Sequence, residues 1–326
     1  MIHLMKAISQ TTLQNSDGAN RREFLRRGGV ALGTAALAAA SPWAVLRSPA
    51  DEPAAAQATP KNCWPMRLST STVMFSSLPV EKACERIAAL GFEAVDFWHS
   101  GFGCPHLQEI EKRLGAAGLR DLLAKHRLKL YAFTCYNVGG VTYPKYADLL
   151  GKAGGGVAVR EARYGRVTNL NAEMKAFLEQ LKPEIELAGK NNTYLAIENH
   201  AASLLGSRDS FKALVDLNRS DRLGIALAPY HLQAAGISVE EVIAIAGKQL
   251  LFFYAWQNAD GLKQLPGIGP TDMTPWIRAL GAAGYTRYVN PFMHGHRGAD
   301  EMTEALKTAR GYLTRCHEQA FPMGKS

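Results

Sequence analysis

Short β-type runs alternate with longer helical patterns along the chain from Met66 onward. Eight such apolar runs occur, and between them apolar residues recur at positions i, i+3, i+4 and i+7. Between Asn171 and Gly189, for example, Met174, Phe177 and Leu181 fall on one face of the expected helix. This alternation favours an α/β fold with a parallel sheet, because each helix returns the chain to the start of the next strand.

The pattern assigns residue ranges to both kinds of element. The expected strands span Met66–Phe75, Ala94–His99, Lys129–Tyr136, Gly156–Arg160, Thr193–Glu198, Gly224–Pro229, Leu250–Gln257 and Tyr288–Phe292. The expected helices span Val80–Leu90, Leu107–His126, Asn171–Gly189, Asp209–Asn218, Val239–Gly247, Thr274–Ala283 and Ala299–Glu318. The segment Asn137–Gly155 is the least regular, so no element boundaries are predicted within it.

The number of β-α units indicates how the sheet closes. Eight units in about 260 residues match a (β/α)8 TIM barrel, which needs about 250 residues. An open doubly wound sheet is the alternative, but it would carry a Gly-rich fingerprint directly after the first strand. The chain instead reads Ser-Ser-Leu-Pro at 76–79. We therefore expect residues 59–326 to form one (β/α)8 TIM barrel.

The N-terminal region reads as an export segment. The run Asn20–Arg27 resembles a twin-arginine signal, with paired arginines followed by Glu, Phe, Leu and Arg. The apolar stretch Gly28–Leu46 follows, and Pro42 interrupts it, so no membrane span of about 20 apolar residues is expected. We expect residues 1–58 to be a signal peptide and an Ala/Pro-rich linker, with cleavage within Ala38–Ala58. The mature protein would then be periplasmic or otherwise exported, after contact with the twin-arginine export machinery.

Charge and cysteine content restrict the partners. Removal of residues 1–58 lowers the formal charge from +8 to +6, and no Lys/Arg block of a nucleic-acid-binding arm remains. The cysteines at 63, 84, 104, 135 and 316 are odd in number and widely spaced, which fits neither a disulfide framework nor a zinc ribbon. One disulfide is permitted in an oxidising compartment. No nucleic-acid partner is expected, and the oligomeric state stays open.

Polar residues end four successive strand candidates. Because the carboxyl ends of barrel strands surround one point, we expect these side chains to converge there. Imidazole and carboxylate groups suit Zn, Mn, Fe or Co. A single strand-end histidine is more often structural, but the coincidence on four units predicts a divalent metal site. Its predicted ligands are Glu198, His231, Gln257 and His294.

Further strand-end residues are candidate contacts for a hydroxyl-rich small molecule. Packing explains the aromatic ones nearly as well, and a solvated ion pair is the main alternative for the arginine. The predicted substrate-binding residues are Trp98, His99, Arg160, His231, Trp256, Asn290 and His296.

The residues at these ends resemble the sugar phosphate isomerase/epimerase superfamily, the xylose-isomerase-like TIM barrels. The resemblance is carried by Leu90–Asp96, Leu195–His200, Leu227–His231 and Pro266–Gly269, and it covers essentially Met66 to Glu318. It implies one divalent metal, often Mn, Co, Mg or Zn. The implied ligands are Glu on strand five, Asp on strand six, His on strand seven and Glu on strand eight.

Only one of the implied ligands is present at its position, as Glu198. The other three positions hold Ala228, a residue at or near Gln257, and Asn290. Two interpretations follow: the metal site is rebuilt with His231 and His294, or the barrel works without metal. We favour the rebuilt site, because both histidines lie close to the replaced carboxylates.

The resemblance also implies chemistry through an enediolate, with Glu198, His200 or His294 as the predicted catalytic residues. Asn290 cannot accept a proton, which favours isomerisation, or β-elimination from a 3-keto-glycoside, over two-base epimerisation. Export favours an unphosphorylated sugar or glycoside, which the sequence does not identify. A non-catalytic carbohydrate-binding barrel is the alternative.

Overall fold

The structure is a computed structural model that describes residues 64–322. The predicted signal peptide, the linker and Cys63 lie outside these residues. Within them, no helix is both long and apolar enough to cross a membrane.

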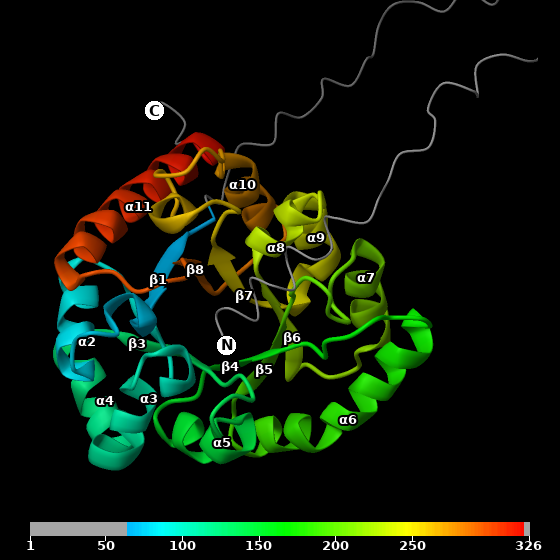
Figure 1. The fold of residues 1–326 in the computed structure, drawn as a ribbon, viewed down its shortest axis with the longest axis horizontal. Coiled ribbons are helices and arrows are strands. Elements are labelled where there is room, and N and C mark those ends of the chain that lie inside the picture. Colours follow the sequence, from blue (N-terminus) through cyan, green and yellow to red (C-terminus); the bar gives the residue numbers. More distant parts are fainter. Residues whose placement is uncertain (1–63, 323–326) are drawn as a thin grey trace, which may run out of the picture. The chain divides into compact units, whose positions relative to one another are not determined.

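Eight parallel strands pair in chain order, and β1 pairs with β8 to close the barrel. In Figure 1 the helices form a ring outside the strands, following the chain from α2 to α11. The predicted (β/α)8 TIM barrel is therefore confirmed. The strands are β1 Arg67–Ser71, β2 Ala94–Phe97, β3 Lys129–Thr134, β4 Val157–Glu161, β5 Tyr194–Glu198, β6 Leu223–Leu227, β7 Leu250–Ala255 and β8 Tyr288–Pro291.

The helices bury one apolar face each against the strands. In α6 this face includes Met174, Phe177 and Leu181, as the sequence period predicts. Asn169 caps this helix by accepting a hydrogen bond from the backbone N–H of Ala172 at 3.1 Å. The helices are α2 Val80–Ala89, α3 His106–Glu109, α4 Gly115–His126, α5 Tyr143–Lys152, α6 Leu170–Lys190, α7 Arg208–Leu217, α8 Pro229–Ala234, α9 Val239–Ala246, α10 Thr274–Ala282 and α11 Ala299–Ala320.

The structure differs from the sequence prediction at several element ends. The strand predicted to reach Phe75 ends at Ser71, and a 3-10 turn follows it. The predicted helix Leu107–His126 is divided, because a wide turn at Ile110–Leu114 separates α3 from α4. Two helices were not predicted. α5 lies in the irregular segment, and α8 begins at Pro229, whose fixed φ suits a first helical turn.

Aromatic side chains close the barrel interior at the amino ends of the strands. The Tyr131 ring stacks on Phe252 with centroids 4.5 Å apart. The Tyr131 hydroxyl lies 2.9 Å from the hydroxyl of Tyr285 and donates to the carbonyl of Leu251 at 3.0 Å. A substrate site inside the barrel therefore has to open at the carboxyl ends, where barrel active sites lie.

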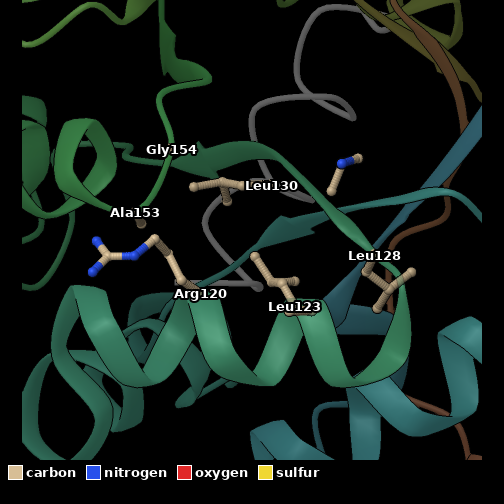
Figure 2. Close-up of a pocket in the computed structure, with 8 residues that line it drawn as sticks. Arg120, Leu123, Leu128, Leu130, Ala153 and Gly154 are labelled. Carbon is tan, nitrogen blue, oxygen red and sulfur yellow. The ribbon is translucent and has the colours of Figure 1, made fainter.

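A surface cavity of about 330 Å³ lies between α4, the start of β3 and the turn before β4. Figure 2 shows Leu123 projecting from α4 towards Leu130, and Arg120 extending towards Ala153. Since Leu130 is near the start of β3, this cavity belongs to the amino ends of the strands and not to the predicted site.

The four cysteines among residues 64–322 are buried and free, namely Cys84, Cys104, Cys135 and Cys316. The disulfide that the sequence permits is therefore not formed between any two of them. Burial raises the pKa of the Cys84 and Cys104 thiols to about 12, so these groups are inert at neutral pH.

Candidate metal centre

Three side chains converge at the carboxyl ends of β5 and β6. Glu198 is the last residue of β5, His200 follows two residues later, and His231 lies in α8 directly after β6. One ligand atom from each lies within 4.8 Å of the others. The Nε2 atom of His200 is 3.6 Å from Oε1 of Glu198, and the two imidazole centroids are 4.6 Å apart. We call these three residues the His/Glu cluster.

Two nitrogen atoms of the His/Glu cluster have no hydrogen-bond partner among residues 64–322. They are Nδ1 of His200 and Nε2 of His231, and both are buried. Buried polar atoms are nearly always paired, so these two unpaired nitrogens call for an explanation. One carboxylate and two imidazoles are a suitable donor set for a divalent transition metal. The His/Glu cluster therefore fits a metal ion.

Burial controls the charge of the His/Glu cluster. It lowers the pKa of His200 to about 4, and it holds the pKa of His231 well below its usual range. Both imidazoles are thus neutral at pH 7, which is the form that binds metals. Burial also raises the pKa of Glu198 to about 8. A nearby cation would favour the ionised carboxylate and oppose this shift.

Glu198 is held by Tyr136, whose hydroxyl donates a hydrogen bond to Oε2. The Tyr136 ring packs edge-on against Trp98, with centroids 5.9 Å apart. The Trp98 indole N–H donates to Asp96 at 2.6 Å, and Asp96 also accepts from the Ser71 hydroxyl at 2.7 Å. The sequence pattern placed Tyr136 only at the end of a predicted strand and assigned no role to Asp96. The alternation of Asp96 and Trp98 along one strand was the available signal.

His294 lies at the solvent-exposed rim beside the His/Glu cluster. Its ring centroid is 4.5 Å from that of Trp256 and 6.5 Å from that of Tyr230. Its backbone N–H donates to Oε1 of Gln264 at 3.0 Å, and the same oxygen accepts from the Trp256 indole at 2.7 Å. His294 is near the three clustered residues but is not one of them.

The structure does not bring the predicted ligand Gln257 into the His/Glu cluster. Its Nε2 donates to the carbonyl of Leu265 at 2.9 Å, and its Oε1 accepts from the backbone N–H of Thr271 at 2.8 Å. Trp256 and Gln257 follow the end of β7, and Trp256 packs against the rings of Phe292 and His294. Gln257 therefore points away and fixes the loop 265–271.

Two predicted substrate-binding residues are engaged elsewhere. Asn290 lies inside the barrel, where its Oδ1 accepts from the Ser69 hydroxyl at 2.9 Å and its Nδ2 donates to the Ser71 hydroxyl at 3.0 Å. Arg160 forms an ion pair at 2.5 Å with Glu184 of α6, a helix of the outer ring. The expectation that Arg160 reaches the substrate does not match this placement.

The remaining predicted substrate-binding residues are either buried or connect two loops. Trp98 and Trp256 are almost inaccessible and pack within the aromatic core. His99 is also buried; its Nδ1 accepts from the backbone N–H of Gly101 at 3.2 Å. His296 is exposed, and its Nδ1 lies 2.8 Å from the Ser76 hydroxyl, which ties the loop after β8 to the loop after β1.

Two residues beside the His/Glu cluster were not predicted as site residues. Tyr164 is 47% exposed, and its ring centroid is 5.7 Å from that of His200. Glu161 pairs in register with Glu198 on the neighbouring strand, and burial raises its pKa. Its carboxylate accepts from the backbone N–H of Asn137 at 3.3 and 3.4 Å. Glu161 is the last residue of β4, and Tyr164 lies in the loop that follows it. The sequence prediction ended this strand at Arg160, one residue too early.

A closed (β/α)8 barrel with carboxylate and imidazole groups at the carboxyl ends of its strands has the architecture of a barrel enzyme. The chain belongs to the xylose isomerase-like TIM barrel family, whose sequence model matches residues 84–316. A comparison with curated protein sequences gave no match.

Solved structures with the same fold include enzymes that modify sugars. The chain is 16% identical to an IolI protein with a bound zinc atom, with a TM-score of 0.65 over 79% of this chain and 100% of the other. It is 15% identical to the 3-keto-D-glucoside 4-epimerase YcjR from E. coli, with a TM-score of 0.59 over 76% of this chain and 100% of the other. It is also 15% identical to the probable 3-DHS dehydratase AsbF from Bacillus anthracis, with a TM-score of 0.60 over 74% and 98%.

Proposed function

We propose that this protein is a metal-assisted enzyme that moves a proton next to a carbonyl group of an unphosphorylated sugar or glycoside. The observation that carries the proposal is the His/Glu cluster, with its two unpaired buried imidazole nitrogens. Its position at the carboxyl ends of the strands supports a catalytic role. The zinc-bound IolI protein and the 3-keto-D-glucoside 4-epimerase, which share its fold, support the metal and the substrate class.

Glu198, His200 and His231 would hold the metal ion. When bound, a divalent ion polarises a substrate carbonyl and stabilises the oxyanion that develops on proton removal. Two imidazoles and one carboxylate favour Zn, Co or Mn over Mg, because Mg prefers oxygen ligands.

His294 is the residue best placed to move the proton. Glu198 and His200, the other predicted catalytic residues, belong to the His/Glu cluster, whereas His294 is exposed beside it. His294 lies beside Trp256 and Tyr230 at the rim, where a neutral imidazole can accept a proton. Glu161 is the other ionisable residue beside the His/Glu cluster, but its carboxylate already accepts a hydrogen bond from the backbone N–H of Asn137.

β-Elimination from a 3-keto-glycoside is the second candidate for the same site. Asn290 occupies the strand-eight position, cannot take a proton, and is fixed by Ser69 and Ser71. A site with one base suits a reaction that needs a single proton abstraction. The base removes the proton next to the carbonyl, the carbon–oxygen bond to the aglycone breaks, and the leaving alkoxide takes a proton.

An uncharged substrate agrees with the charges at the rim. Arg160 at the end of β4 pairs with Glu184, and Arg163 in the loop after β4 pairs with Glu173, so both arginines already have an acidic partner in place of a phosphate. The twin-arginine-like sequence at 20–27 gives a separate reason for the same substrate class. A protein exported to the periplasm would meet free sugars and glycosides, and we propose that location.

Proton exchange in D2O tests the proposed reaction. The purified protein, loaded with Co²⁺ or Zn²⁺, is incubated with ketoses, aldoses and 3-keto-glucosides, and NMR follows deuterium at the carbon next to the carbonyl. We expect exchange that falls at least tenfold in His294→Ala and stays unchanged in His126→Ala, a control on α4. Sugar binding without exchange in the wild type would support the non-catalytic alternative and overturn the proposal.

A further inference from the structure

We infer that Tyr136 is a positioning residue that sets the metal affinity of the His/Glu cluster through its hydrogen bond to Glu198. This inference rests on the proposed metal site and adds the group that orients its only carboxylate.

The contacts of Tyr136 place it between two members of the His/Glu cluster. Its hydroxyl donates to Oε2 of Glu198, and its ring packs edge-on against the His200 ring with centroids 5.9 Å apart. Tyr136 is 6% exposed and Glu198 is 2% exposed, so water competes little for this hydrogen bond. When a bound cation keeps the carboxylate ionised, this hydrogen bond has a charged acceptor and is among the stronger ones in proteins.

The hydrogen bond divides the roles of the two carboxylate oxygens. Oε2 is occupied by the Tyr136 hydroxyl, whereas Oε1 is the oxygen 3.6 Å from Nε2 of His200. Oε1 is therefore the oxygen that the Tyr136 hydroxyl leaves for an ion held with the two histidines. Without the hydroxyl, the carboxylate could rotate, and fixing it again on metal binding would cost affinity.

Tyr136 is itself fixed by a column of buried side chains. Trp98 packs against its ring and is also stacked on Phe292, with centroids 5.2 Å apart. Trp98 in turn donates to Asp96, which is fully buried and accepts from the hydroxyls of Ser71 and Thr134. The column thus links β1, β2 and β3 to the carboxylate on β5. A rigid metal site requires such support behind its ligands.

A Co²⁺ titration of the purified, metal-stripped protein tests the inference through the visible absorption spectrum of the bound ion. Tyr136→Phe keeps the ring and removes only the hydroxyl. Tyr143→Phe is the matched control, because Tyr143 is equally buried and its hydroxyl bonds Thr193, at the opposite end of β5. Thermal unfolding of each variant checks that the fold is retained.

We expect Tyr136→Phe to weaken Co²⁺ binding by about 10- to 100-fold and to change the absorption spectrum. Trp98→Phe, which removes the donor to Asp96, should weaken binding in the same direction by a smaller factor, and Tyr143→Phe should leave it unchanged. Unaltered affinity and spectrum in Tyr136→Phe would overturn the inference while leaving the metal site intact. A wild-type protein that binds no Co²⁺ would overturn both.

Discussion

The imidazole rings of His200 and His231 lie with centroids 4.6 Å apart, and each has one buried nitrogen without a partner among residues 64–322. Two neutral imidazoles so close to Glu198 would be a costly arrangement if their nitrogens stayed unpaired, because each buried unsatisfied group costs about 1–3 kcal/mol. A ligand that pairs with them removes this cost. A bound divalent ion should therefore stabilise the fold.

Metal should raise the thermal stability of the wild type. At a free metal concentration 100 times the Kd, the stabilisation is about 2.7 kcal/mol. We expect Zn²⁺ or Co²⁺ to raise Tm in the wild type after EDTA treatment, and to raise it much less in His200→Ala. Differential scanning fluorimetry measures this shift. An equal rise in both proteins would mean that the metal binds elsewhere.

Replacement of Gln264 should separate stability from metal binding. Its side-chain oxygen accepts from the Trp256 indole and from the backbone N–H of His294. Gln264→Leu leaves the buried indole donor unpaired, so we expect unfolding free energy to fall by about 1–3 kcal/mol. His294 should also lose its position, so proton exchange should fall while Co²⁺ affinity stays constant.

Urea unfolding, proton exchange and Co²⁺ titration give these three quantities. Gln249→Leu is the control, because Gln249 bonds Asn218 and Val215 at the amino end of β7. It should reduce stability and leave proton exchange unchanged. Normal exchange in Gln264→Leu would show that this contact does not position His294.

A carboxylate at position 290 should be unfavourable. Ser71 has one hydroxyl proton, which it donates to Asp96, and it accepts from Asn290. In Asn290→Asp the Ser71 oxygen would face a second buried carboxylate without a proton between them. We therefore expect the free energy of unfolding to fall by about 1–3 kcal/mol. Urea unfolding at pH 7 measures it. Asn169→Asp, at the N-cap of α6, should be nearly neutral, and equal losses in both variants would contradict the explanation.

Glu173 should contribute to stability in a pH-dependent way. Its carboxylate accepts from the backbone N–H groups of Asn169 at 3.0 Å and Thr168 at 2.8 Å, which, with Arg163 nearby, lowers its pKa from 4.5 to about 2. A lowered native pKa means that the contribution is complete above about pH 4.5 and disappears as the pH falls through about 2.

Urea unfolding at pH 6 and pH 3 should therefore show a smaller stability loss on acidification for Glu173→Gln than for the wild type. Glu179→Gln, at an exposed residue of the same helix that pairs with Lys182, is the control and should behave as the wild type. Identical pH dependence in all three proteins would rule out this role for Glu173.

The fold could be predicted from the sequence because the period of apolar residues encodes both helices and strands. The α6 face formed by Met174, Phe177 and Leu181 is one case in which period and burial agree. Element ends were less accurate, because the apolar run extends beyond the hydrogen-bonded strand. The helix α8 was missed since Pro229 was included in the preceding strand.

The site was only partly predictable, because it lies at the strand ends and in the loops after them, where the apolar period stops. Glu198 and His231 were assigned to one metal site, and the structure brings them together. Gln257 was assigned with them as the last residue of a strand, but β7 ends at Ala255, and the loop 265–271 holds the Gln257 side chain instead. His200 was expected to act as a base, and its place in the His/Glu cluster depends on a loop whose path no sequence period specifies.

Metal analysis of the purified protein tests the central claim most directly. The wild type, His231→Ala and the control His126→Ala are exposed to the same mixture of Zn, Co, Mn and Mg ions, desalted and analysed by plasma mass spectrometry. The proposed site predicts a stoichiometric divalent ion in the wild type and in His126→Ala, and its loss in His231→Ala. No bound metal in the wild type, or an unchanged content in His231→Ala, would contradict it.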